Sequence, residues 1–163
     1  MEVAGIILSI RPEFVDAIFA GRKLVELRRR RPDIGPAAVV YVYCTAPRKE
    51  VPGQFRCRTV HSGSPKELWS RFGRYSCISK ARFLSYFRGV GIGYALEIDQ
   101  ARRWLKPVSL ATLRRIAPNF WPPQFYRRIS TDEPLFFQLS RHDQLGVRRA
   151  RIDSRRPALA PSR

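Results

Sequence analysis

The chain has 163 residues, of which 44% are hydrophobic and 12% aromatic, a composition that favours one compact domain with a packed core and excludes global disorder. Lys and Arg number 31 against 13 Asp and Glu, so the net charge is +18 and the expected partner is a polyanion such as nucleic acid. No apolar run reaches the ~18 residues of a membrane helix, and the short apolar run after Glu2 does not resemble a signal peptide, so we expect a cytoplasmic protein without a membrane partner.

The first thirty residues predict a strand, a helix and a second strand. Residues 4–10 form a short apolar run rich in Ile, which is typical of a buried strand. Pro12 suits the first turn of a helix and Gly21 suits its end. Residues 23–29 then read as a strand, in which Leu24, Glu26 and Arg28 alternate with Lys23, Val25 and Leu27. In such a strand Lys23 and Glu26 lie on opposite faces unless a bulge intervenes.

The middle of the chain carries clear strand and helix signals. Ser64, Pro65 and Glu67 have the spacing of a helix capping box, and Ser79 can cap a further helix that Gly89 ends. The predicted elements are strands at 37–47 and 53–60, helices at 64–72 and 79–89, and a long strand at 91–105.

The last third is less regular. Ser109 can cap a short helix over 109–116, the aromatic and proline-rich residues 120–130 predict a loop or short turn, and residues 133–140 predict a last strand. Residues 141–163 carry seven Arg and two Asp without periodicity, which indicates a basic, flexible tail. We therefore expect a single domain over residues 1–140, which keeps a net charge of +13 without the tail.

The element order predicts an α+β fold. No strand–helix–strand rhythm persists along the chain, which argues against a doubly wound parallel sheet. A small mixed β-barrel of five to six strands, with three to four short helices packed around it, fits the pattern better.

Cysteine and histidine give no sign of a metal site or disulfide framework. The three cysteines form no CxxC pair, and Cys44 and Cys57 are expected as small core residues. The two histidines have no partner at ligand spacing, so we expect neither a metal nor any other cofactor.

The segment LSIRPEFVDAIFAGRKLVELRRRRP resembles the ASCH domain family, within the PUA-like superfamily of small β-barrels. The family pattern Gly-x-Lys-x-x-Glu-x-Arg is filled by Gly21, Lys23, Glu26 and Arg28. Later segments, such as YVYCTAP, SPKELW and GYALEID, are similar to a bacterial subgroup of this family, so the resemblance covers about residues 5–140.

The resemblance implies a barrel with a cleft at one end that takes RNA or a modified nucleotide, with RNA expected over DNA. Some relatives are ribonucleases, and one branch removes an acyl group from acetylated cytidine. That branch matches this chain at Lys23 but has Thr where Glu26 stands, and Glu97 is the nearest candidate for its second acid. Lys23, Glu26 and Glu97 are accordingly the candidate catalytic residues, with a structural ion pair of Glu26 as the alternative.

The predicted nucleic-acid contacts combine cations for phosphates with aromatic or hydroxyl groups for bases. They are Arg22, Arg28, Arg29, Arg30, Tyr43, Thr45, Arg56, Arg58, Phe125, Tyr126 and Arg127. For several of them a structural role is equally open: Tyr43 can pack in the core, Thr45 can cap a turn, and Phe125 with Tyr126 can form a packed lid.

Three functions compete at this point. The favoured one is a nucleic-acid-binding module with a basic cleft. The second is a hydrolase that cleaves RNA or an acylated cytidine, using Lys23 with Glu26 or Glu97. The third is an accessory subunit that meets unknown protein partners through its helices.

Overall fold

A computed structural model of the protein describes residues 2–149 and residue 159. The strands are β1 (Val3–Ile10), β2 (Val25–Arg28), β3 (Ala38–Cys44), β4 (Glu50–Gly63), β5 (Gly93–Ser109), β6 (Tyr126–Ser130) and β7 (Val147–Arg149). The helices are α1 (Pro12–Phe19), α2 (Pro65–Phe72), α3 (Lys80–Tyr86), α4 (Leu110–Ile116) and α5 (Pro134–Gln144), with a 3-10 turn, η1 (Gly73–Tyr75), after α2. Within the described residues, no helix has the length and the unbroken apolar stretch that a membrane crossing needs.

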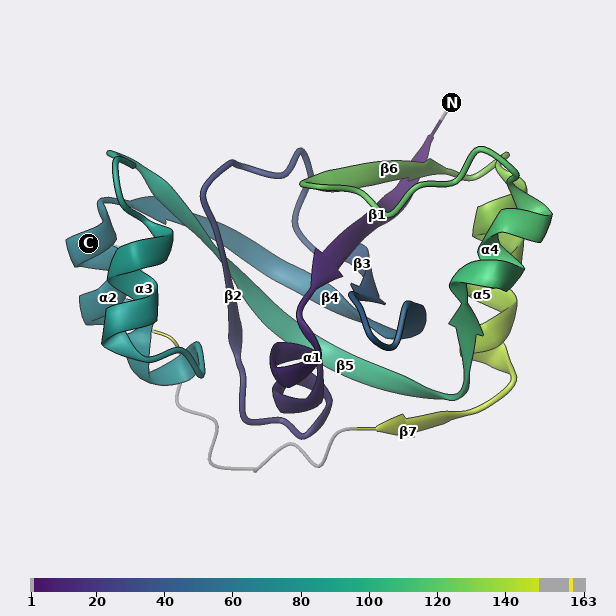
Figure 1. The fold of residues 1–163 in the computed structure, drawn as a ribbon, viewed down its shortest axis with the longest axis horizontal. Helices are drawn as coiled ribbons and strands as arrows, with labels where there is room; N and C mark the ends of the chain where they lie inside the picture. The colour runs from purple at the N-terminus through teal and green to yellow at the C-terminus, as the bar shows by residue number, and fades with distance from the viewer. Residues whose placement is uncertain (1, 150–158, 160–163) are drawn as a thin grey trace.

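The strands form one mixed sheet whose order is β2-β5-β4-β3-β1-β6, with β7 paired to β5 (Figure 1). β1 and β3 run parallel, and the other paired strands run antiparallel. The fold is therefore the mixed α+β, barrel-like arrangement that the sequence predicts. The barrel is not closed, because β2 and β6 stand at the two ends of the path.

Three apolar clusters hold this sheet together. The central cluster packs α1 against the inward side chains of β1, β3, β4 and β5, and includes Val15, Leu8 and Phe55. A second cluster packs α4 and α5 against the other face of the sheet, and a third packs α2 and α3 against β2 and β5. Figure 1 shows the two helix pairs at opposite ends of the molecule, with α1 between them.

The helix caps predicted from sequence are present. Ser64 and Glu67 form the reciprocal capping box at the start of α2, and the side chains of Ser79 and Ser109 accept from the backbone of α3 and α4. Each cap satisfies a backbone N–H that has no partner within its own helix, which is why these boundaries can be read locally.

The last predicted strand is wrong. Residues 133–140 begin α5, with Pro134 in its first turn and the buried Leu135 and Leu139 one helical turn apart. The predicted loop over 120–130 is also only partly correct, since Tyr126–Ser130 forms β6 and pairs antiparallel with β1. Both errors have the same cause: the local pattern is short, and the element is decided by packing against other elements, β1 for β6 and β5 for α5.

The predicted domain boundary at residue 140 falls inside α5. Beyond it, β7 pairs with β5 through Val147 opposite Trp104. The rest of the predicted tail, residues 150–158 and 160–163, lies outside the described residues.

Candidate functional site

A cavity of about 780 Å³ lies where the barrel fails to close. Its lining comes from β1, from β2 and the residues after it, from α1 and α3, and from residues 122–126 before and at the start of β6. The volume falls within the range of about 300–1,000 Å³ in which proteins bind small ligands. The opening of the sheet thus creates a ligand-sized site.

The gap exists because β6 covers only part of β1. Their pairing stops at Leu8 opposite Tyr126, so Ser9 has a strand partner only on the β3 side. Pro122 and Pro123 precede β6, and proline cannot donate to a further ladder bond. The Ser9 hydroxyl instead donates to the Pro123 carbonyl at 2.7 Å, which fixes the rim of the gap.

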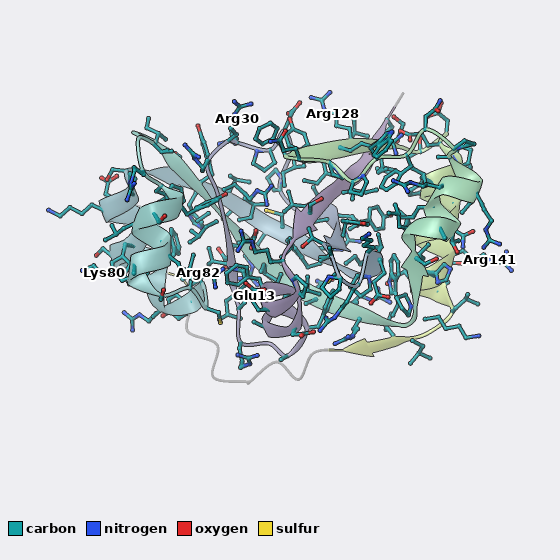
Figure 2. The ribbon with its side chains drawn as sticks, viewed as in Figure 1. Glu13, Arg30, Lys80, Arg82, Arg128 and Arg141 are labelled. Atoms are coloured by element: carbon teal, nitrogen blue, oxygen red, sulfur yellow. The ribbon has the colours of Figure 1, made fainter. Side chains whose placement is uncertain are left out.

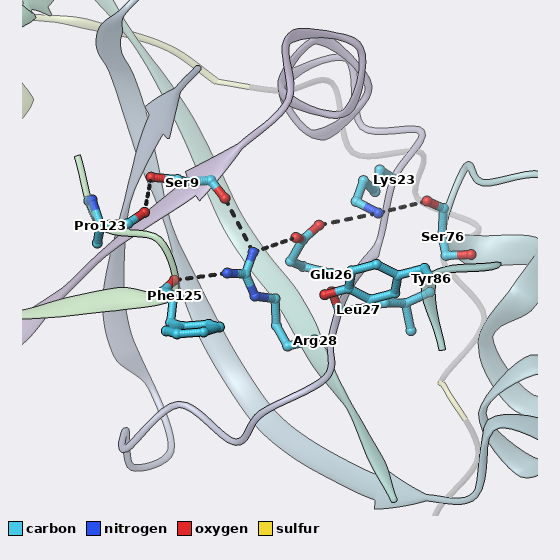
Figure 3. Close-up of polar contacts among 9 residues, drawn as sticks. All are labelled: Ser9, Lys23, Glu26, Leu27, Arg28, Ser76, Tyr86, Pro123 and Phe125. Atoms are coloured by element: carbon cyan, nitrogen blue, oxygen red, sulfur yellow. Dashed lines mark hydrogen bonds and ion pairs between the residues drawn. The ribbon is translucent and has the colours of Figure 1, made fainter. Parts of the chain in front are cut away.

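Arg28 bridges the two edges of the open barrel (Figure 3). From β2 its guanidinium donates to the carbonyl of Ser9 on β1 at 3.2 Å and to the carbonyl of Phe125 at 2.8 Å. The same group meets the Glu26 carboxylate at 3.4 Å. Arg28 therefore joins the parts of the rim, and three of its five N–H donors take part in these contacts.

Lys23, Glu26 and Arg28 form a continuous charged row in the cavity wall. The Lys23 ammonium donates to the Ser76 carbonyl at 2.7 Å and lies 3.3 Å from a Glu26 oxygen. The other Glu26 oxygen meets Arg28, as Figure 3 shows. Lys23 and Glu26 are only 3% and 6% exposed, so their charges compensate one another away from bulk water.

The expectation that Lys23 and Glu26 lie on opposite faces is wrong. The strand begins only at Val25, so Lys23 stands before it and is not bound by its alternation. Gly21 turns the chain with a positive φ of 77°, and the Lys23 backbone N–H still bonds to Ala17 of the preceding helix. This turn brings the ammonium onto the carboxylate's side.

Aromatic side chains make up the other walls. Phe14, Tyr86, Phe125 and Tyr126 all line the cavity, and Phe125 is 42% exposed. The Lys23 ammonium lies 4.6 Å from the centre of the Phe14 ring. Burial raises the pKa of the Tyr86 hydroxyl, which donates to the Leu27 carbonyl at 3.3 Å and stays neutral. These rings offer flat apolar surface next to the charged row.

The mouth of the cavity is cationic. Arg29 and Arg30 follow β2, Arg82 comes from α3, and all three line the cavity. The Arg30 guanidinium lies 4.3 Å from the centre of the Phe125 ring, and Arg82 pairs with Glu13 of α1 at 3.1 Å (Figure 2). An anion at the mouth would meet several guanidinium groups at once.

Eight of the residues predicted from sequence meet in this cavity. They are Lys23, Glu26, Arg28, Arg29, Arg30, Thr45, Phe125 and Tyr126. The other six do not line it: Glu97, Arg22, Tyr43, Arg56, Arg58 and Arg127.

The six outlying residues have other surroundings. Glu97 is buried on β5, where it meets His61 at 3.2 Å and Arg58 at 3.8 Å. Tyr43 is buried against Phe120, and burial raises its pKa. Arg127 pairs with Glu133 at 2.9 Å. Arg56 donates to the carbonyl of Ala37 at 3.0 Å, and Arg22 is exposed.

The lining residues that were not among the predicted contacts include Arg11, Phe14, Arg82 and Tyr86. In the sequence, Phe14 belongs to the apolar face of a predicted helix. Arg82 and Tyr86 lie in the predicted helix over 79–89, where nothing marks them as ligand contacts. Their place in the cavity comes from the packing of α1 and α3, for which the sequence carries no local signal.

Within the described part of the chain, no group of three or more His, Cys, Asp or Glu side chains is placed to hold a metal ion. The three cysteines are free thiols, with Cys44 and Cys57 buried and Cys77 exposed.

Comparison with known proteins adds family evidence to this geometry. No protein-family model matches the chain. A protein of Zymomonas mobilis named ASCH domain-containing ribonuclease is 36% identical over 118 residues, which span 72% of this chain and 79% of that protein. The crystal structure of ASCH from Zymomonas mobilis superposes with a TM-score of 0.75 at 32% identity, covering 83% of this chain and 94% of the other.

A more distant structure shares the fold alone. The N-terminal domain of Staphylothermus marinus McrB superposes with a TM-score of 0.53 at 13% identity, covering 90% of this chain and 96% of that one.

Proposed function

The chain belongs to the ASCH domain family, and from this premise we propose that it binds single-stranded RNA, with one base inside the cavity and the backbone at its cationic mouth. The observation that carries the proposal is the combination found in one cavity: aromatic walls, a polar row, and a rim of guanidinium groups. Unpaired bases stack on aromatic side chains, while arginines hold phosphates. The ribonuclease named among the relatives favours RNA over DNA as the polyanion.

A charge-matched pair of variants tests this proposal. Arg29→Ala with Arg30→Ala removes two cations at the mouth, and Lys66→Ala with Lys106→Ala removes two exposed cations that do not line the cavity. Binding of a fluorescently labelled single-stranded RNA is measured by anisotropy at several salt concentrations. The mouth variant is expected to bind about tenfold more weakly and to lose about 0.7 units of salt slope for each phosphate contact removed.

The matched variant keeps the same net charge as the mouth variant and should bind nearly as well as the wild type. Equal weakening of the two variants would show that RNA follows net charge rather than the cavity. Failure of the wild-type protein to retain RNA at low salt would contradict the proposal directly.

RNA cleavage is the second candidate function, favoured by the name of the Zymomonas mobilis relative. For cleavage, a phosphate rather than a base would have to reach the charged row. Lys23 would then stabilise the negative charge that develops on the phosphoryl oxygens, and Glu26 would take or give a proton.

End-labelled RNA incubated with the wild type and with Lys23→Ala, in buffers with Mg²⁺ and with a chelator, separates binding from cleavage. Cleavage predicts products that disappear in Lys23→Ala while RNA retention persists. If the protein retains RNA but forms no product in either buffer, the protein binds RNA without cleaving it.

A further inference from the structure

The charged row presents hydrogen-bonding groups in a fixed order: a donor, an acceptor and a donor. Lys23 is the first donor, the Glu26 carboxylate is the acceptor, and Arg28 is the second donor, with 3.3 and 3.4 Å between neighbours. All three residues line the cavity, and Figure 3 shows them joined in one line from Ser76 to Ser9.

The contacts within the described residues do not exhaust this row. Lys23 has three donors, of which Ser76 and Glu26 take two. Arg28 has five, of which the carbonyls of Ser9 and Phe125 and the Glu26 carboxylate take three. Each Glu26 oxygen accepts from one cation and can accept once more. A ligand in the cavity can therefore still bond to every member of the row.

We propose that this row recognises uracil in single-stranded RNA, a specificity that rests on the RNA-binding function proposed above. The pairing edge of uracil carries a carbonyl, an N–H and a carbonyl in that order. The carbonyls meet Lys23 and Arg28, and the N3–H meets the Glu26 carboxylate, so that each bond is assisted by a full charge on the protein.

The other bases present the wrong order. Cytosine has an unprotonated N3 with a lone pair, which would face the lone pairs of Glu26, and its amino group would face a cation. Adenine likewise turns an acceptor toward the carboxylate. Guanine offers two neighbouring donors and one carbonyl, so one of its N–H groups would meet a cation. Each mismatch leaves a buried polar group of the row without a partner, which is a strong source of discrimination between ligands.

Because the row has a donor at each end, uracil can bind with its O2 carbonyl at either Arg28 or Lys23, and the neighbouring residues favour one of these two orientations. The ribose is attached next to the O2 carbonyl, so placing O2 at Arg28 directs the sugar toward Arg29 and Arg30 at the mouth. Placing O2 at Lys23 would direct the sugar toward the buried Ser76 instead. The first orientation brings the phosphates to the cationic rim and leaves the face of the base to the aromatic walls.

The test compares labelled oligo(U), oligo(C), oligo(A), oligo(dT) and an oligo(U) methylated at N3, binding to the wild-type protein near neutral pH. We expect oligo(U) to bind about tenfold more tightly than oligo(C) or oligo(A), and N3-methylation to remove that advantage, because it blocks the bond to Glu26. Equal binding of all the sequences would overturn the proposal while leaving RNA binding in place. No binding of any oligonucleotide would instead overturn the proposed function.

Oligo(dT) has the same pairing edge on a deoxyribose backbone. Weaker binding of oligo(dT) than of oligo(U) supports RNA as the source of the base. Equal binding of oligo(dT) and oligo(U) would show that the backbone does not have to be RNA, while the recognition of the pairing edge of the base would still hold.

A Glu26 variant tests whether the charged row causes the preference for uracil over cytosine. Glu26→Gln keeps the shape of the side chain but replaces one acceptor oxygen with a donor, and we expect the ratio of oligo(U) to oligo(C) affinity to fall to about one. Its fold is checked by thermal unfolding, and the methylated oligonucleotide on the wild type gives the same answer without a variant. An unchanged ratio in a folded Glu26→Gln protein would exclude Glu26 as the reader of the base.

Discussion

At the scale of single residues, Glu26 is the centre of the site because its buried carboxylate is held between two cations in the cavity wall. A buried charge that loses its partner costs far more than the pair contributes, since water no longer solvates the group left behind. The same residues that present a polar edge to a ligand therefore also stabilise the fold around it.

Replacement of Lys23 is the corresponding prediction. Lys23→Met keeps most of the apolar side chain but removes one of the two cations beside Glu26 and the donor to the Ser76 carbonyl. It should lower the free energy of unfolding by about 1–3 kcal/mol, because Arg28 still pairs with the carboxylate. Denaturant unfolding measures the change, with Lys66→Met at an exposed position as the control. A loss for Lys23→Met no larger than that of the control would contradict the buried ion pair.

A buried thiol and a buried phenol that stay protonated predict how the stability of the protein changes at alkaline pH. Burial, followed by the nearby Glu97 carboxylate, raises the pKa of the Cys57 thiol from 9.0 to about 12, and burial raises that of Tyr41 from 10.0 to about 12. The folded state then holds these protons where the unfolded state releases them, so stability is complete below the unfolded pKa values and declines as the pH rises toward 12.

Unfolding free energies measured from about pH 8 to about pH 11 should therefore decrease, and Cys57→Ala should make the decrease shallower. In the same pH range thiol reagents should modify the exposed Cys77 before the buried Cys44 and Cys57. Stability that rises with pH, or early modification of Cys57, would contradict this environment.

The site residues of the motif segment and of the loop before β6 could be predicted from the sequence, whereas the lining residues from α1 and α3 could not. Lys23, Glu26 and Arg28 lie in a recognisable local pattern, and the loop pair Phe125 and Tyr126 stands out by composition. Glu97 is outside this pattern and was a candidate only through the resemblance to the branch that acts on acetylated cytidine. It lies outside the cavity, because the sequence does not show where a β5 side chain is directed.

At the scale of elements, the cavity lies in the gap between β2 and β6, the two end strands of the sheet, and the Arg28 side chain spans this gap. Arg28 joins the Ser9 carbonyl to the Phe125 carbonyl, which comes after two prolines that interrupt the ladder. The segment 122–126 has few other backbone partners among the strands, so its position depends on this bridge.

Loss of the bridge should loosen that segment. Arg28→Met removes the guanidinium, and amide hydrogen exchange over residues 122–130 should become faster while β4 and β5 keep their protection. Arg127→Met, which removes the ion pair between β6 and Glu133 at the start of α5, is the control. Unchanged exchange over residues 122–126 in Arg28→Met would mean that other contacts hold the rim.

The pairing of β4 with β5 leaves no room for a side chain at Gly53. A Cβ at this position would lie 2.2 Å from the Arg102 carbonyl oxygen, whereas a Cβ at Gly35 meets nothing within 4 Å. Gly53→Ala should therefore destabilise the protein by about 1–3 kcal/mol through overpacking, and Gly35→Ala should be close to neutral. Chemical denaturation compares the two, and equal stabilities would argue against the close approach of these strands.

Local signals explain which elements could be predicted. Ser64, Ser79 and Ser109 mark helix starts with their own side chains, so these helices were found from sequence. β6 is defined by its pairing with β1, more than a hundred residues away, and α5 by its packing against β5, α4 and β6, so neither element carries a sufficient local signal. Intrinsic preference is a weak guide wherever such distant packing decides.

At the scale of the whole molecule, the net charge of +18 explains attraction to polyanions but does not select a site. Basic side chains lie at many places on the surface, and Figure 2 places Lys80 and Arg141 at opposite ends of the molecule. What distinguishes the mouth of the cavity is that its arginines lie beside aromatic rings and the charged row of Lys23, Glu26 and Arg28. We therefore propose that the whole surface attracts the polyanion and that the open side of the barrel binds it specifically.

Photocrosslinking of the wild-type protein to single-stranded RNA that carries 5-iodouridine tests this assignment most directly, because the reagent joins the base to aromatic side chains in contact with it. After digestion, mass spectrometry identifies the residues attached to RNA. We expect attachment at Phe14, Tyr86, Phe125 or Tyr126, all in the cavity wall. Attachment confined to aromatic residues outside the cavity, such as the exposed Trp121 or Phe137, would contradict it.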